Sequence, residues 1–140
     1  MDGDESRAIA GRFYASFDAG DVDGCISVFA KDLETTDPGM GTVHGLEPFR
    51  EYLETLKRAV PDARAVIEAL HDAGETVVVE GRFVGAFTGP LATPEGDIPP
   101  TGAAVDLRFC DVSRVSRGRI VSYHTYYDQL TLMTQLGIGG

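Results

Sequence analysis

The sequence predicts one α+β domain, over residues 1–140, in which helices precede a strongly curved antiparallel sheet. Apolar residues recur every three to four positions before about residue 60, and every second position between about residues 65 and 127. Glycines inside the strand-like segments indicate bends or bulges. Helices segregated beside a bent sheet favour a cone that encloses a cavity, where small ligands bind.

Three helices are expected in the first part of the chain. The first covers residues 4–18, where apolar side chains repeat at i, i+4 and i+8 and form one stripe. Asp21 or Asp23 can cap a second, short helix that holds Ile26, Val28 and Phe29. The third covers residues 46–60 and carries a proline that its first turn tolerates.

Four antiparallel strands and a last helix complete the predicted order. The expected strands are residues 65–70, 76–88, 103–115 and 120–127, and the helix is residues 130–136. Gly137 ends that helix, and residues 89–100 form a loop rich in proline and glycine.

Charge and composition exclude several classes of protein. The 12 Lys and Arg against 22 Asp and Glu give a net charge of −10, which argues against nucleic acid, because phosphates need clustered cations. The chain start lacks the pattern of a signal peptide, and no apolar run has the roughly 18 residues that a membrane span needs. Cys25 and Cys110 lack a paired-motif spacing, which fits a reducing compartment. A cytoplasmic protein without nucleic-acid or membrane partners is therefore expected.

The sequence lacks the motifs of metal, nucleotide and nucleophilic sites. Its histidines, at positions 44, 71 and 124, have no metal-ligand spacing. There is no glycine-rich phosphate loop and no Gly-x-Ser-x-Gly nucleophile motif. We therefore expect neither a metal nor a cofactor.

Several short segments recur in one order in a known family. They are PDAR at 61–64, GAFTGPL at 85–91, IPPTG at 98–102, GRIV at 118–121, YD at 127–128 and QLG at 135–137. In this ordered set the chain, from about Ser6 to Gly137, resembles the SnoaL-like polyketide cyclases and ester cyclases of the nuclear transport factor 2-like superfamily.

The resemblance implies a cone-shaped fold and a homodimer formed through the sheet. It also implies an intramolecular aldol condensation without metal or organic cofactor, in which an aspartate late in the last strand is the acid and base. Asp128 is the matching position. Phe87 stands where many relatives carry a histidine.

Asp128 also stands out by itself, because it is the only formally charged side chain between Ile120 and Gly140. Apolar surroundings raise the pKa of a carboxyl group and make it a proton shuttle near neutral pH. The alternative is that Asp128 caps the following helix, which would lower its pKa. On a strand, His124 and Tyr126 share its face, and either would stabilise an oxyanion.

A substrate pocket is expected where the helices, a loop and a strand converge. Its predicted residues are Tyr14, Phe17, Met40, His44, Tyr52 and Phe87. Asp37, before a turn-rich loop, is expected to stabilise that turn, and the alternative is a contact with His44.

The sequence thus favours a cofactor-independent enzyme with a hydrophobic pocket that acts on a lipophilic carbonyl compound. Asp128 would remove a proton next to the carbonyl and return one to an alkoxide, as an aldol-type cyclase or an isomerase does. One alternative is a non-catalytic binding or dimerisation domain, whose pocket has no titratable group with a shifted pKa. In that domain Asp128 would bond to the amides of Leu130 or Thr131. The other is the opening of an epoxide by a water that Asp128 activates.

Overall fold

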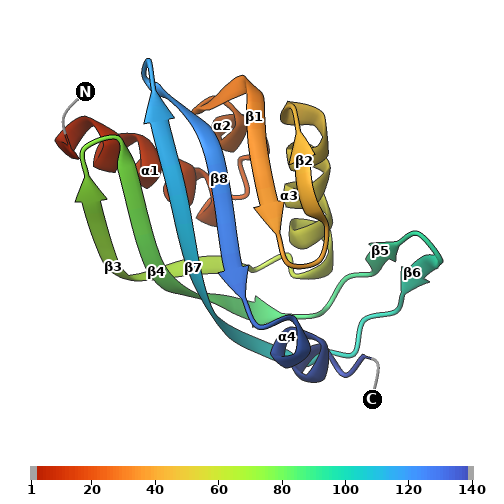
Figure 1. Cartoon of the computed structure of the whole chain (residues 1–140). Helices are drawn as coiled ribbons and strands as arrows, with labels where there is room; N and C mark the ends of the chain where they lie inside the picture. The colour runs from red at the N-terminus through yellow and green to blue at the C-terminus, as the bar shows by residue number, and fades with distance from the viewer. Residues whose placement is uncertain (1–2, 139–140) are drawn as a thin grey trace.

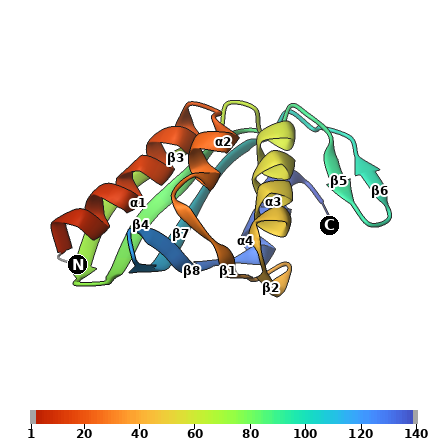
Figure 2. The ribbon, with the colours of Figure 1, turned by 90° about the horizontal axis from the view of Figure 1, so that it is seen from above.

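The computed structural model describes residues 3–138 and consists of one curved six-stranded sheet with helices packed against it (Figure 1). The strand order is β2-β1-β8-β7-β4-β3. Viewed from above, α1 and α3 stand apart over the sheet, and the β5–β6 hairpin extends away from it (Figure 2). No helix among the described residues is long and apolar enough to cross a membrane.

The α+β class is confirmed, and four helices lie close to the predicted ones, although α2 ends at Ile26 and does not include Val28 and Phe29. The helices are α1 (Gly3–Asp18), α2 (Val22–Ile26), α3 (Leu46–Ala59) and α4 (Gln129–Leu136). The α1 stripe is buried in the core, Asp21 caps α2 by accepting a bond from the Gly24 amide, and Gly137 ends α4 with a left-handed φ of 78°.

The sheet is built from strands that differ greatly in length. They are β1 (Phe29–Asp37), β2 (Gly41–His44), β3 (Arg64–Ala73), β4 (Thr76–Ala86), β7 (Ala104–Ser116) and β8 (Arg119–Tyr127). A separate hairpin consists of β5 (Leu91–Thr93) and β6 (Gly96–Ile98). This hairpin lies within the segment predicted as a loop.

The predicted order of three helices followed by four antiparallel strands is wrong at β1 and β2. These strands lie between α2 and α3, and Phe29 begins a strand instead of belonging to a helix. Two of the buried positions of β1 are the polar residues Thr35 and Asp37, and a register shift follows Phe29, so its apolar alternation is weak. Because β1 pairs with β8 in parallel, the sheet is mixed.

Aromatic side chains from four elements join the helices to the sheet. The Phe29 ring lies 5.1 Å from Phe13 and 4.6 Å from Phe49, measured between ring centroids, and Tyr123 lies 5.4 Å from Phe49. Such pairs add about 0.5–1.5 kcal/mol each beyond the area they bury. This cluster fixes α1 and α3 over β1 and β8, and so determines the width of the gap between the helices and the sheet next to the cluster.

Candidate active site

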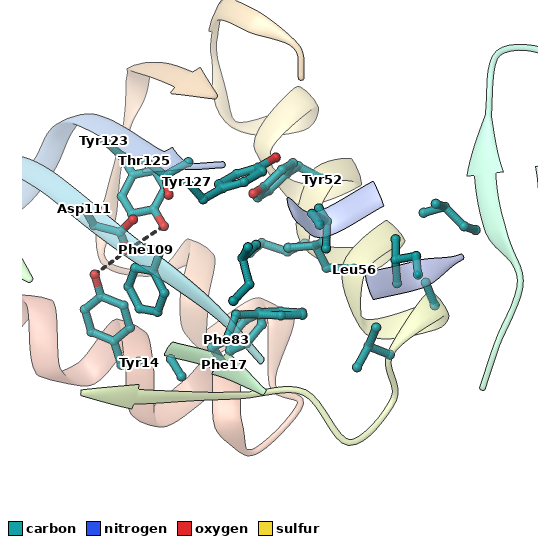
Figure 3. Close-up of a pocket in the computed structure, with 18 of the residues that line it drawn as sticks. Tyr14, Phe17, Tyr52, Leu56, Phe83, Phe109, Asp111, Tyr123, Thr125 and Tyr127 are labelled. Carbon is teal, nitrogen blue, oxygen red and sulfur yellow. Dashed lines mark hydrogen bonds between the residues drawn. The ribbon is translucent and has the colours of Figure 1, made fainter. Parts of the chain in front are cut away.

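An apolar cavity of about 150 Å³ lies between α1, α3, α4 and the sheet (Figure 3). Its walls are mostly aromatic and aliphatic side chains, with a few polar groups among them. The lining residues are Phe13, Tyr14, Phe17, Tyr52, Leu53, Leu56, Ala59, Val60, Ala65, Phe83, Leu91, Leu107, Phe109, Asp111, Tyr123, Thr125, Tyr127, Leu132, Met133 and Leu136. A cavity of this composition suits a lipophilic ligand.

Asp111 is the carboxylate of this cavity, and the strand pleat places it there. Successive side chains of a strand point to opposite faces, so Asp111 follows Leu107 and Phe109 on the inner face of β7. Only 1% of Asp111 is exposed to solvent. Thr125 of β8 pairs with it in register and also lines the cavity.

The two oxygens of the Asp111 carboxyl have different surroundings. The hydroxyls of Tyr14 and Tyr123 both donate to Oδ2, at 2.6 Å and 2.9 Å (Figure 3). Oδ1 is buried and receives no hydrogen bond from any described residue. The tyrosines therefore orient the group through Oδ2, and Oδ1 can carry a proton.

Burial raises the pKa of Asp111 from 3.8 to about 6. The neighbouring Thr125, Tyr14 and Tyr123 side chains favour the charged form and oppose this rise, but the loss of solvent outweighs them. Burial and the nearby carboxylate raise the pKa values of Tyr14 and Tyr123 well above the ordinary value, so both remain donors. Asp111 can thus take up and release a proton near neutral pH.

A second buried carboxylate, Asp37, lies behind another part of the cavity wall. Its Oδ1 accepts hydrogen bonds from the amides of Gly39 and Met40, at 2.7 Å and 3.1 Å. Its Oδ2 accepts one from the hydroxyl of Tyr127, at 3.0 Å. The predicted stabilisation of the turn is confirmed, and the Tyr127 contact is an addition that the sequence did not predict.

Asp128 does not line the cavity and caps α4. Its Oδ1 accepts hydrogen bonds from the amides of Leu130 and Thr131, at 3.0 Å and 3.2 Å. These bonds lower the pKa of the exposed Asp128 carboxyl. This is the geometry expected of the capping alternative, and we therefore base no chemistry on Asp128.

His124 and Tyr126 lie on the face of β8 that points away from the cavity. Nε2 of His124 lies 2.8 Å from Oε2 of Glu34, and Tyr126 is 52% exposed. The lining residues of β8 are Tyr123, Thr125 and Tyr127, one position out of step with the predicted set. A strand pattern shows which residues share a face, but not which face is inside.

The structure brings three of the predicted pocket residues to the cavity: Tyr14, Phe17 and Tyr52 line it. Met40 is 42% exposed in its turn, and His44 is exposed with its Nε2 3.8 Å from Oε1 of Glu34. Phe87 is fully buried in the core and is not among the lining residues.

Sequence reasoning missed Asp111, although the sequence contains a signal for it. Every second residue of β7 from Val105 to Val115 is apolar except Asp111 and Ser113, which is the pattern of a strand with a carboxylate on its buried face. Within residues 3–138, no three His, Cys, Asp or Glu side chains are arranged to hold a metal ion.

Comparison with known proteins identifies the family. The family model of the SnoaL-like polyketide cyclases matches residues 8–136. The chain belongs to this family. A search of curated protein sequences found no match.

Solved structures confirm that this SnoaL-like chain has the nuclear transport factor 2-like fold. A proposed SnoaL-like polyketide cyclase from Jannaschia sp. CCS1 has a TM-score of 0.85 at 20% identity, over 99% of this chain and 95% of its own. IdmH, a proposed polyketide cyclase from Streptomyces antibioticus, has a TM-score of 0.78 at 23% identity, and the match covers 95% of this chain and 99% of IdmH. AclR, a proposed hydroxylase from Streptomyces galilaeus, has a TM-score of 0.82 at 18% identity, and the match covers 96% of this chain and 82% of AclR.

The raised pKa of Asp111 predicts a pH-dependent stability difference from Asp111→Asn. The folded pKa, about 6, lies above the ordinary value of 3.8. The neutral carboxyl thus stabilises the fold below about pH 4, and this contribution is lost as the pH rises to about 6. The variant has no such loss, so its free energy of unfolding relative to wild type should rise by about 2 kcal/mol from pH 4 to pH 7.

Urea denaturation of both proteins at several pH values measures this difference. Asp128→Asn is the matched control, because the Asp128 pKa is lowered, and its difference from wild type should change in the opposite sense. A difference between Asp111→Asn and wild type that is constant with pH would show that Asp111 is not buried with a raised pKa.

Proposed function

We propose that this SnoaL-like protein is a cofactor-independent acid/base enzyme that acts on a lipophilic carbonyl compound, with Asp111 as its catalytic residue. The observation that carries the proposal is the Asp111 carboxyl, which is buried among the lining residues of an apolar cavity and whose Oδ1 lacks a hydrogen-bond partner among the described residues. A carboxyl group with a pKa near 6 is both a usable base and a usable acid at neutral pH.

The proposed reaction begins with removal of a proton from a carbon next to the carbonyl. Oδ1 of ionised Asp111 takes the proton, the C–H bond breaks, and its electron pair forms an enolate. In an isomerase, the neutral Asp111 returns the proton to another carbon. In an aldol cyclase, the enolate carbon attacks a second carbonyl of the same molecule, and Asp111 protonates the resulting alkoxide. Either sequence regenerates the ionised carboxylate.

Tyr14 and Tyr123 act as positioning residues in this reaction. Their bonds to Oδ2 hold the carboxylate plane and disperse part of its charge, without occupying the reactive oxygen. Because they come from α1 and β8, the position of Asp111 depends on the packing of the helix against the sheet. Catalysis of this type depends on such prior organisation.

A non-catalytic binding domain is the main alternative, and the position of Asp128 agrees with it. That alternative also expects a pocket without a titratable group of shifted pKa. Asp111 is such a group, and it supports the enzyme over the binding domain.

Exchange of carbon-bound hydrogen tests the catalytic role of Asp111. With 2-tetralone in D₂O, NMR should show that the wild-type protein accelerates loss of the protons next to the carbonyl. Asp111→Asn should lower this acceleration by roughly 10²–10⁴-fold, because the base is lost. Asp128→Asn should exchange at the wild-type rate. Equal rates for Asp111→Asn and wild type would refute the assignment.

We further propose that the outer face of the sheet pairs two copies of the chain. Across this face Glu80, Cys110 and the exposed Tyr126 lie next to one another in register on β4, β7 and β8. Arg108 lies in the next row beside Arg82, which is already paired with Asp106 of its own chain, so Arg108 is the basic group that a two-fold-related copy could pair with an acidic one.

Light scattering measures the assembly directly. The wild-type chain should have twice its mass of 15.0 kDa, and Tyr126→Glu should shift it toward the single chain because it adds a charge at the centre of the face. A wild-type mass of 15.0 kDa at a protein concentration of about 100 µM, at which even a weak dimer would form, would exclude the dimer.

A further inference from the structure

A polar hollow of about 270 Å³ lies on the outer face of the sheet, on the side opposite to the apolar cavity. Its lining includes Glu68 of β3, Glu80 of β4, Arg108 and Cys110 of β7, and Tyr126 of β8. The strand pleat directs these side chains outward, because the neighbouring positions on the same strands point to the inner face. The helices α1, α3 and α4 line the cavity on that inner face, so they do not cover the hollow.

The outer face holds two arginines directly opposite each other in the sheet, and only one of them is paired. Arg82 of β4 is in register with Arg108 of β7. Nη1 of Arg82 donates to both carboxyl oxygens of Asp106, at 3.0 Å and 2.9 Å, and its Nε lies 3.7 Å from Oε2 of Glu68. Arg108 has no hydrogen bond or ion pair with any residue in the described range 3–138. Like charges directly opposite destabilise a sheet, so Arg108 is a cation that an outside carboxylate would stabilise.

The acidic side of the hollow is formed by two half-exposed carboxylates. Glu80 is opposite Cys110, one row from Arg108, so Glu80 and Arg108 are diagonal neighbours, roughly 7–8 Å apart. Oε2 of Glu80 lies 2.9 Å from Nε2 of His71, and its other oxygen has no partner within the part of the chain that the structure describes. The side chains of Glu80 and Glu68 are 57% and 43% exposed. The hollow therefore offers acceptors to a cationic group that enters from outside.

We propose that the hollow of one copy receives Arg108 of a second copy, whose guanidinium bonds to Glu80 and lies beside Glu68. Two-fold symmetry makes each such contact twice, with the axis passing between Arg108 and Glu80. The planar guanidinium has five donors and matches a carboxylate better than an ammonium does. This inference rests on the proposed pairing of two copies through the outer face and names the residues that specify it. It does not depend on the chemistry proposed for Asp111.

The composition of the outer face favours a second copy over other partners. The hollow carries both signs of charge side by side, and a surface that must meet itself has to be self-complementary in this way. A nucleic acid would bring its phosphates against Glu68 and Glu80. Around the hollow, Val78 and Val112 are half-buried and paired in register, and Tyr126 is 52% exposed. Pairing removes this apolar surface from water, while the charged contacts fix its register.

Reversal of the two charges, one at a time, tests the contact. Arg108→Glu sets a carboxylate against Glu80 of the second copy, and Glu80→Arg sets a guanidinium against Arg108. Each variant alone should associate at least roughly a hundredfold more weakly than wild type, because like charges in an interface cost several kcal/mol. In an equimolar mixture, both contacts again join opposite charges. Native mass spectrometry and light scattering should therefore show a dimer that contains one chain of each variant.

The matched control is Arg12→Glu, which changes the net charge equally at an exposed position of α1. This variant should dimerise as wild type does. Circular dichroism checks folding, and Glu80→Lys replaces Glu80→Arg if the latter does not fold. A wild-type chain that stays single would refute both the dimer and this contact. A wild-type dimer that Arg108→Glu does not weaken, or a mixture without mixed dimers, would overturn the contact and leave the dimer itself intact.

Discussion

The hydrogen bonds from Tyr14 and Tyr123 to one oxygen of Asp111 are the interaction on which the rest of the site depends. They connect α1, β7 and β8 in the wall of the apolar cavity. A hydrogen bond to a charged group contributes about 1.5–3 kcal/mol, whereas removing a carboxylate from water costs several kcal/mol. Desolvation therefore wins, the pKa of Asp111 rises to about 6, and the carboxyl becomes a proton carrier.

In the proposed reaction, the charge that makes Asp111 a base also lowers the stability of the fold. Above about pH 6 the ionised Asp111 is a cost to stability, and this cost is what makes it a base. The surrounding aromatic cluster, which packs Phe13, Phe29 and Phe49 together, is a source of stability that can offset it. A buried carboxylate retained in an otherwise apolar cavity is best explained by function.

Much of the fold could be predicted from the sequence, because period and capping are local signals. The stripe of α1, the cap at Asp21 and the stop at Gly137 all act over a few residues. The strand β1 could not be predicted in this way. Asp37 is buried because two backbone amides and the Tyr127 hydroxyl satisfy its carboxylate, whereas the buried Thr35 hydroxyl has no hydrogen-bond partner among the described residues. The parallel pairing of β1 with β8 joins segments about 90 residues apart.

In the site, too, local sequence patterns predicted some features, whereas others depend on contacts between distant parts of the chain. Alternation predicted His124, Tyr126 and Asp128 on one face of a strand, but β8 ends at Tyr127 and Asp128 caps α4. Alternation also does not show which face of β8 the helices bury. The alternate residues of β8, Tyr123 and Tyr127, are the residues at the cavity. Asp128 is far from other charged residues in the sequence, but it is a helix cap. Asp111 has charged neighbours in the sequence, and only the folded structure places it among apolar side chains.

The most direct test of the account is the titration of Asp111 itself. Carbon NMR of the side-chain carboxyl groups, with the Asp111 signal assigned by its absence in Asp111→Asn, gives its pKa in the intact protein. The account predicts a midpoint near pH 6, while Asp128 titrates below the ordinary value of 3.8. An Asp111 midpoint at or below pH 4 would contradict the claim that the cavity makes this carboxyl a proton carrier.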